Sequence, residues 1–278
     1  MPLYEQTYKN KDHFSFGRNW KNFLESLSDE KIKEAEDSLT SFLGGKQNIE
    51  GKTFVDIGCG SGLFSYAAFL SGAEKIVSVD IDDYSVNCVT SLWEKAGRPE
   101  NWIIKKGSAL DTDFILSLGT FDIVYSWGVL HHTGNMYQAF DNVTRLVGQK
   151  GSFFLAIYNR FDTPFRGGTS EFWLWVKQMY NQGGDATKSV MNFIYGSYMA
   201  LMMLARLKNP FTEIRNYKSN RGMSWYHDLV DWLGGYPYEY AGPDEIVNYF
   251  GKKSFACQKM IFRNGIGCNE FLLTKIHE

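Results

Sequence analysis

The sequence predicts an α/β fold in which parallel strands alternate with helices. From residue 53 onward, short apolar segments alternate with longer segments of helical periodicity. A glycine-rich turn with Gly58, Gly60 and Gly62 follows the first apolar segment, and Asp80 ends the second. Strands separated by helices of this length form βαβ units with right-handed crossovers. We therefore expect an open, mostly parallel sheet with ligand groups at the carboxyl ends of its strands.

The individual elements follow from apolar spacing. The expected helices of the βα region lie near residues 62–71, 82–96 and 135–147. The expected strands of that region are Thr53–Ile57, Ile76–Asp80, Trp102–Lys105, Phe121–Ser126 and Gly151–Tyr158.

Helical segments precede and follow this region. Apolar residues recur at three- and four-residue steps over residues 18–43, and Gly44-Gly45 ends that helix. After Asn159 the alternation stops, and residues 161–235 contain helical segments rich in Trp, Met and Tyr. We divide the chain into an N-terminal helical cap (1–45), a Rossmann-like core (46–160), a helical and aromatic lid over the substrate site (161–235) and a closing unit (236–278).

The closing unit consists of one helix and a hairpin. A helix starts at Pro243, with acidic residues in its first turn. Two strands follow, Ser254–Phe262 and Glu270–Ile276, and the short connection Arg263-Asn264-Gly265 makes them antiparallel. The predicted fold is a Rossmann-like seven-stranded sheet, mostly parallel with its last strand antiparallel, carrying a helical insertion.

Composition limits the classes of partner. The chain has 278 residues, a formal net charge of −2 and no long run of Lys or Arg. A protein that grips many phosphates shows a basic stripe, so we expect no nucleic-acid partner. A small-molecule acceptor is the expected partner, and composition leaves the oligomeric state open.

Cysteine spacing and hydropathy bear on location. No pair of the four cysteines has the spacing of a zinc or redox site, and the N-terminus lacks the apolar core of a signal peptide. We expect a cytoplasmic protein. Residues 190–207 are apolar but include Asn192 and Arg206, so we predict a buried or interfacial helix rather than a spanning one. Peripheral contact with a membrane stays open.

The strongest chemical motif lies between the first strand and its helix. It reads Val55-Asp56-Ile57-Gly58-Cys59-Gly60-Ser61-Gly62. The glycines allow a sharp turn and a close approach of ligand to backbone, and the helix start presents free N–H groups. A dinucleotide site would need a third glycine where Leu63 stands. The pattern favours a nucleoside that carries an amino acid, with Asp56 accepting from loop amides or pairing with a cationic ligand group.

Two further strand ends carry polar groups. Asp80 lies 22 positions after Gly58, where a carboxylate holds a ribose diol. The third strand is followed by Ser108 and Ala109, and the fourth runs through Ser126 and Trp127 to the neighbouring pair His131 and His132. A histidine there can act as a general base. The alternative for each histidine is a residue that caps the next helix and orders the loop. Adjacent histidines point apart, so we expect no metal site.

These segments resemble the class I S-adenosylmethionine-dependent methyltransferases, and are similar to the ubiquinone and menaquinone biosynthesis type. The resemblance covers residues 50–160 through DIGCGSG, the acidic strand end, GSALD and SWGVLHH, with residues 240–276 fitting the last helix and strands. It implies that S-adenosylmethionine is the cofactor and that Asp56 and the glycines hold its methionine part. It also implies that Asp80 binds the ribose and Ile81 the adenine. Ser108 stands where many relatives place an acidic residue, and Ala109 and Ser126 complete the expected cofactor set.

The expected acceptor site combines core and lid. Arg18, Trp127 and Tyr226 are candidates to contact the acceptor, and Arg221 could hold an anionic group. His227 is a third candidate base, which Asp228 could orient; the alternative is a surface helix with a salt bridge. We expect methyl transfer to a hydroxyl, or less readily an amine, of a small organic or sugar-like molecule. A hydrophobic quinone acceptor, a nicotinamide oxidoreductase and a non-catalytic cofactor-binding protein are the alternatives.

Overall fold

A computed structural model describes residues 27–163, 168–221 and 225–276. It contains one seven-stranded sheet with the order β3-β2-β1-β4-β5-β7-β6. Strands β1 to β5 are parallel, and β7 is antiparallel to both of its neighbours. The strands are β1 (Thr53–Ile57), β2 (Lys75–Asp80), β3 (Trp102–Lys106), β4 (Phe121–Trp127), β5 (Val147–Tyr158), β6 (Phe255–Ile261) and β7 (Cys268–Lys275). The predicted mixed sheet with an antiparallel last strand is confirmed.

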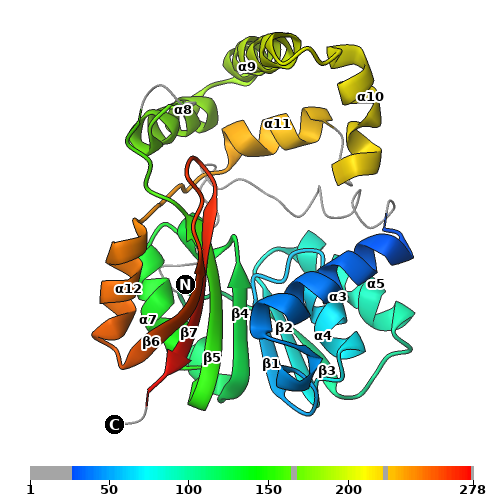
Figure 1. The fold of residues 1–278 in the computed structure, drawn as a ribbon, viewed down its shortest axis with the longest axis vertical. Helices are drawn as coiled ribbons and strands as arrows, with labels where there is room; N and C mark the ends of the chain where they lie inside the picture. The colour runs from blue at the N-terminus through cyan, green and yellow to red at the C-terminus, as the bar shows by residue number, and fades with distance from the viewer. Residues whose placement is uncertain (1–26, 164–167, 222–224, 277–278) are drawn as a thin grey trace.

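Helices cover both faces of the sheet (Figure 1). One face packs on α3 (Asp29–Leu43), α4 (Leu63–Leu70) and α5 (Asp83–Lys95) through a buried apolar cluster. The other face packs on α6 (Thr112–Ser117), α7 (Met136–Thr144) and α12 (Pro243–Gly251) through a second cluster. Side chains of a strand alternate between the faces, so Phe54 belongs to the first cluster and Val55 to the second. Both clusters together make the central strands apolar on each side.

Several predicted boundaries are wrong for local reasons. Within the described residues, helix α3 starts at Asp29 because Ser28 caps it, accepting a hydrogen bond from the amide of Lys31; residues 18–26 lie outside that range. The short helix α6 was not predicted, although Asp111 caps it. The fifth strand begins earlier than expected because Val147 already pairs with Phe121 across an irregular register.

In the closing hairpin, the first strand ends and the second begins one to two residues earlier than predicted. Strand β6 ends at Ile261 and β7 begins at Cys268. The intervening loop is anchored by Asn269, whose Oδ1 accepts a hydrogen bond of 2.9 Å from the amide of Arg263. That side-chain bond replaces the strand pairing that would have made the turn tight.

Four helices form the predicted insertion between β5 and α12. They are α8 (Ser170–Gln182), α9 (Asp185–Ala205), α10 (Pro210–Arg221) and α11 (Trp225–Gly234). We call them the lid, and Figure 1 shows that they stand over the edge of the sheet from which β5 continues into α8. A third cluster, centred on Trp173, Leu229 and Leu233, packs against Tyr158 at the end of β5. No helix among the described residues is long and apolar enough to cross a membrane.

The antiparallel closure of the sheet is expected to contribute strongly to stability. Phe271 on β7 is fully buried and faces Met260, which is 43% exposed on the edge strand β6. Phe271→Ala should lower the free energy of unfolding by about 3–5 kcal/mol in urea denaturation, since it removes core contacts and leaves a cavity. Met260→Ala is the matched control and should cost below about 1 kcal/mol. Equal costs at the two positions would contradict this account of the core.

Candidate functional site

The turn between β1 and α4 can be formed only by glycine. Gly58, Gly60 and Gly62 have φ angles of 77°, 53° and 79°, in the left-handed region. A Cβ on Gly58 would lie 2.3 Å from a methyl group of Val129, and one on Gly62 would lie 2.6 Å from Val89. The turn therefore lies in close contact with the β4–α7 loop and with α5. It presents backbone rather than side chains at the first residues of α4.

Asp80 ties this turn to the end of β2. Its Oδ2 accepts a hydrogen bond of 2.9 Å from the amide of Gly60, and its Oδ1 accepts one of 2.9 Å from the amide of Asp82. Burial is the main cause that raises the pKa of Asp80, to about 6, while these two amide bonds oppose the rise. Each carboxylate oxygen can accept more than one hydrogen bond. Asp80 is thus positioned at the strand end with acceptor capacity left for a ligand diol.

Asp56 lies below the turn and is only 2% exposed. Its Oδ2 accepts a hydrogen bond of 2.7 Å from Ser65 Oγ on α4. Ser78 Oγ donates to Ser65, and Trp102 Nε1 donates to Ser78, which makes a buried chain across β1, α4, β2 and β3. The sequence interpretation expected Asp56 to accept from loop amides or to pair with a cationic ligand group; in the structure its Oδ2 accepts from the hydroxyl of Ser65 on α4. Burial and the nearby Asp80 raise the pKa of Asp56 to about 7, against the effect of the Ser65 bond.

The other predicted cofactor residues gather at the same edge. Ile81 follows β2 and is partly buried. Ser108 follows β3, and its Oγ accepts a hydrogen bond of 3.1 Å from the amide of Leu110, while Ala109 packs against the core. The amide of Gly107 donates to the carbonyl of Asp80, so the ends of β2 and β3 are joined. Ser126 is fully buried and donates to the carbonyl of Ile57, so its hydroxyl supports the end of β1.

The two neighbouring histidines follow β4 and have opposite hydrogen-bonding roles. His131 is fully buried, and its Nδ1 accepts a hydrogen bond of 3.3 Å from the amide of Tyr158, so a neutral ring carries its proton on Nε2. His132 is partly buried, and its Nδ1 lies 2.5 Å from the carbonyl oxygen of Pro237, so Nδ1 carries the proton and Nε2 the lone pair. Burial lowers the pKa of His131 well below its usual value. The neutral ring of His131 is therefore held by the amide of Tyr158, while its Nε2 is buried without a hydrogen-bond partner among the described residues.

The predicted acceptor residues separate into three groups. Trp127 is 44% exposed at the end of β4. Tyr226 and Asp228 lie on α11 and contact other lid helices: Asn192 on α9 donates to the Tyr226 hydroxyl, and Tyr217 on α10 donates to Asp228. The side chains of Arg221 and His227, and the whole of Arg18, lie outside the described residues.

A buried lysine joins the lid to this edge, and the sequence interpretation missed it. Lys177 on α8 is fully buried, and its Nζ donates to the carbonyl of Trp232. The ammonium lies 4.5 Å from the centroid of the Trp232 ring and 5.1 Å from that of Tyr238. Burial lowers the pKa of Lys177 to about 7. The helical spacing contained the signal, because Lys177 lies four residues after the buried Trp173.

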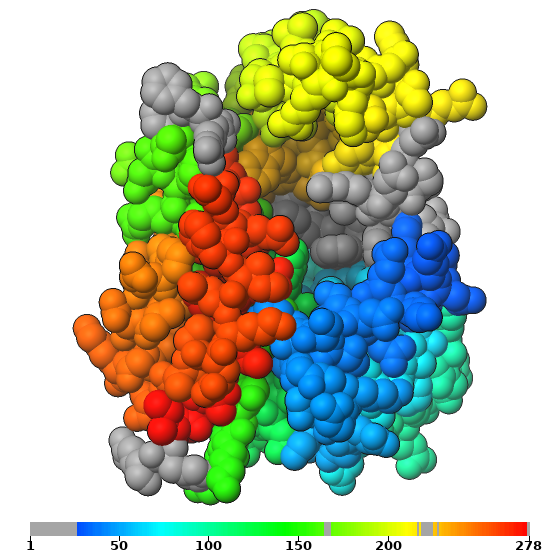
Figure 2. Space-filling model, in the orientation of Figure 1, coloured from blue at the N-terminus to red at the C-terminus, as the bar shows by residue number. Residues whose placement is uncertain are grey.

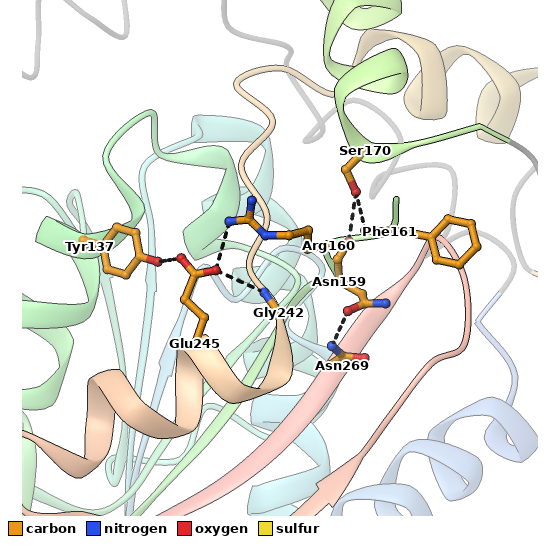
Figure 3. A network of polar contacts seen from close by, with 8 residues as sticks. All are labelled: Tyr137, Asn159, Arg160, Phe161, Ser170, Gly242, Glu245 and Asn269. Atoms are coloured by element: carbon orange, nitrogen blue, oxygen red, sulfur yellow. Dashed lines mark hydrogen bonds and ion pairs between the residues drawn. The ribbon is translucent and has the colours of Figure 1, made fainter. Parts of the chain in front are cut away.

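A polar network fixes the point where the chain leaves β5 for the lid (Figure 3). Asn159 and Asn269 are buried and share a side-chain hydrogen bond of 2.9 Å. Ser170, the first residue of α8, accepts from the amide of Phe161 and donates to the carbonyl of Asn159. The base of α8 is thereby held to the end of the sheet.

A second part of that network lies at the start of α12 (Figure 3). Glu245 accepts hydrogen bonds from Tyr137 on α7, from the amide of Gly242 and from Arg160, whose Nη2 lies 2.9 Å from Glu245 Oε2. These bonds join both ends of the lid to the core. In the described ranges, no group of three or more His, Cys, Asp or Glu side chains is placed to hold a metal ion.

The burial of Asp56 predicts a specific dependence of stability on pH. A carboxyl whose pKa is raised in the folded state stabilises the fold fully below pH 4, and this contribution is lost as pH rises through about 7. Asp56→Asn keeps the acceptor for Ser65 and removes the buried charge. Above pH 7 it should therefore raise the free energy of unfolding by roughly 2–4 kcal/mol, and by much less at pH 4. Chemical denaturation at several pH values measures this difference.

The control is Asp113→Asn, at an exposed carboxylate on α6. It should leave the dependence of unfolding on pH as in the parent chain. If Asp56→Asn were equally destabilised at pH 4 and pH 8, the ionised carboxylate of Asp56 would not lower the stability of the parent chain.

The comparisons with known proteins agree with this geometry. Residues 55–155 match the family model described as "Methyltransferase domain". A ribosomal protein L11 methyltransferase of Photobacterium profundum is 41% identical over 51 residues, 18% of this chain and 17% of that protein. The corresponding protein of Thermotoga maritima is 36% identical over 77 residues, 28% of this chain and 27% of that protein. The matched segments thus span less than a third of these curated relatives.

Solved structures share the fold over most of the chain. The magnesium protoporphyrin IX methyltransferase of Synechocystis PCC 6803 with bound SAH aligns with a TM-score of 0.51 and 14% identity, over 87% of this chain and 82% of that one. PKMT2 of Rickettsia typhi in complex with AdoHcy aligns with a TM-score of 0.55 and 14% identity, over 87% of this chain and 52% of that one. At this identity the likeness shows the fold. The family match identifies residues 55–155 as a methyltransferase domain, and these solved structures with bound S-adenosylhomocysteine share its fold.

Proposed function

We propose that the chain transfers a methyl group from S-adenosylmethionine to a hydroxyl, or less readily an amine, of a small organic or sugar-like acceptor. The acceptor would bind between the carboxyl edge of the sheet and the lid of residues 161–235. The observation that carries this proposal is the pair of histidines after β4, whose Nδ1 atoms have opposite roles. A neutral His132 ring carries its proton on Nδ1, which faces the Pro237 carbonyl, so its Nε2 is the ring nitrogen that would act as a base for a hydroxyl.

The residues present fit the cofactor. The left-handed φ angles at Gly58, Gly60 and Gly62 give a turn without side chains at these three positions, where a ligand would meet backbone. Asp80 would accept from the ribose hydroxyls, and Ile81 and Ser108 would border the adenine. When bound, S-adenosylmethionine supplies an electrophilic methyl group. The protein would bind and orient the two reactants and exclude water from them.

We assign the acceptor side by position. His132 would take the proton of the acceptor hydroxyl, and the fixed ring of His131 would order the loop around it. Trp127, exposed at the end of β4, would form one side of the acceptor site. Tyr226 and Asp228 would hold the lid helices together through their contacts with α9 and α10. Arg18, Arg221 and His227 are proposed acceptor contacts on the sequence argument alone.

Two other acceptors are favoured by one observation each. The curated relatives named ribosomal protein L11 methyltransferases favour a protein acceptor, although 17% of the Photobacterium protein is matched. The exposed apolar residues of α9 favour a hydrophobic quinone.

The free thiols of all four cysteines are in keeping with a cytoplasmic location.

An assay of S-adenosylhomocysteine formation distinguishes these acceptors. It would be run with a panel of hydroxyl and amine compounds, with purified ribosomal protein L11 and with a short-chain quinol. Product with hydroxyl compounds alone supports the proposal, and product with L11 alone overturns the small-molecule acceptor. Binding of S-adenosylmethionine without turnover on any acceptor would favour the non-catalytic alternative.

Asp80 provides a test of the cofactor assignment. Asp80→Asn should weaken S-adenosylmethionine binding by about 1–3 kcal/mol in calorimetric titration, because hydrogen bonds to a charged acceptor are lost. Hydroxyl donors favour the ionised carboxylate, so binding to the parent chain should weaken as pH falls through about 6. The variant should lose this part of the pH dependence.

Asp83→Asn is the matched control, since Asp83 lies three positions away and forms an exposed ion pair with Lys106. It should bind the cofactor as the parent chain does. If Asp80→Asn also binds normally, the ribose assignment is wrong.

His132 provides a test of the proposed base. With an accepted hydroxyl compound, His132→Asn should lower kcat by about 10²–10⁴-fold and leave the Kd for S-adenosylmethionine within a few-fold, since the ring acts on the acceptor. His227→Asn, at the other candidate base in the lid, is the comparison. Loss of turnover in His227→Asn but not in His132→Asn would move the base to the lid.

A further inference from the structure

The outer face of α9 is apolar and uncovered. Its exposed side chains form one stripe, because residues three, four and seven positions apart share a helix face. The members of this stripe are Val190, Phe193, Ile194, Tyr198, Leu201 and Leu204, with exposed fractions from 45% to 75%. No charged residue occurs from Ser189 to Ala205. Figure 2 shows that α9 and α10 form one end of the molecule, away from the sheet.

The opposite face of α9 already has its partner in the fold. Gly196 is the buried residue of this helix, and a Cβ there would lie 3.1 Å from Trp225 and 3.3 Å from Leu229 on α11. Met191 and Tyr195 pack against the cluster of the lid. The fold therefore uses one side of an apolar helix and leaves the other to solvent. An exposed apolar surface of this extent marks an interaction site.

The end of α9 is unfavourable in two ways: one residue has a left-handed backbone, and apolar side chains are exposed to water. Leu207 follows the helix with φ 58°, and the amide of Lys208 closes the helix end on the carbonyl of Met203. Glycine is the residue that favours this position, since leucine has a Cβ penalty there. Leu207 is also 98% exposed, and the nearby Phe211 is 85% exposed. No packing within the described part of the chain offsets either cost.

The charge around this end identifies the partner. Near this end, from Arg206 to Arg215, three cations occur, namely Arg206, Lys208 and Arg215, against one anion, Glu213, although the whole chain has a net charge of −2. A cavity of about 240 Å³ at this end is lined by Met199, Met202 and Met203 and bordered by Arg206, Lys208 and Glu213, the last two of which form an ion pair. An apolar face with cations at its rim suits the interface of an anionic bilayer, where acyl chains lie below negative headgroups.

We propose that α9 and the start of α10 dock the protein on an anionic membrane surface. Leu207 and Phe211 insert between the acyl chains, the stripe of α9 lies at the interface, and Arg206 and Lys208 meet the headgroups. The helix does not cross the bilayer, in keeping with the absence of a sufficiently apolar span in the described residues. Docking of this kind does not depend on the proposed methyl transfer.

Vesicle flotation of the full chain tests the proposal. The vesicles are phosphatidylcholine alone, or phosphatidylcholine with three parts in ten phosphatidylglycerol. We expect flotation with the anionic vesicles, several-fold less in 0.5 M salt and little with phosphatidylcholine alone. Absence of flotation with the anionic vesicles at low salt would overturn the proposal.

Leu207→Gly separates membrane contact from folding. Because glycine favours the left-handed position, this variant should have an unchanged or higher Tm, yet bind anionic vesicles less; with Phe211→Ser added, binding should fall about tenfold or more. Ser254→Gly is the matched control, since Ser254 has φ 61° on the far side of the protein and carries no charge. It should change neither flotation nor its salt dependence.

Sedimentation velocity tests whether a second copy of the chain, rather than a membrane, covers this face. The parent chain without vesicles should have the same association state as the Leu207→Gly/Phe211→Ser variant. A parent dimer that the double variant dissociates, with no flotation of either, would instead assign the face to a second copy of the chain.

Discussion

The turn from β1 into α4 requires glycine at three positions with left-handed φ angles, and it is the feature around which we place the cofactor. Its first and last glycines press against Val129 and Val89, which belong to different connections of the sheet. In the order β3-β2-β1-β4-β5, the connections from β1 and β4 leave toward opposite faces, and open α/β sheets bind their ligands at such a point. The close packing of the two glycines holds the turn against both connections. Asp80 then holds the middle of the turn through the amide of Gly60.

The two carboxylates near this turn, Asp56 and Asp80, have different structural roles. Asp56 belongs to the chain of Ser65, Ser78 and Trp102 and serves the packing of α4 on the sheet. Asp80 lies at the edge, with backbone amides on both oxygens. Burial raises the pKa of each, because the ionised carboxylates are poorly solvated when no ligand is bound. A cationic sulfonium and ammonium group bound nearby would meet a complementary field, which favours S-adenosylmethionine over an anionic dinucleotide.

The lid has two faces with different chemistry. Its inner face joins the core through the buried Lys177, the rings of Trp232 and Tyr238, and the polar network at Asn159 and Glu245. Its outer face is the apolar stripe of α9, ending in Leu207. A lid that is anchored at both ends and touches a membrane would place the acceptor site close to the bilayer. This arrangement connects the proposed docking to acceptors that partition into lipid.

The sequence alone determined the βα order, the glycine turn, Asp80 and the closing hairpin, because these depend on local spacing and on backbone angles that few residues adopt. Leu63 in place of a third glycine also disfavoured a dinucleotide, and the resemblance to methyltransferases implied S-adenosylmethionine. Tertiary structure decided the remainder. The partner of Asp56, the opposite roles of His131 and His132, the burial of Lys177 and the exposure of α9 depend on which distant segments pack together. Helical periodicity shows that a face is apolar, but only the packing of α11 on Gly196 decided which side of α9 is covered.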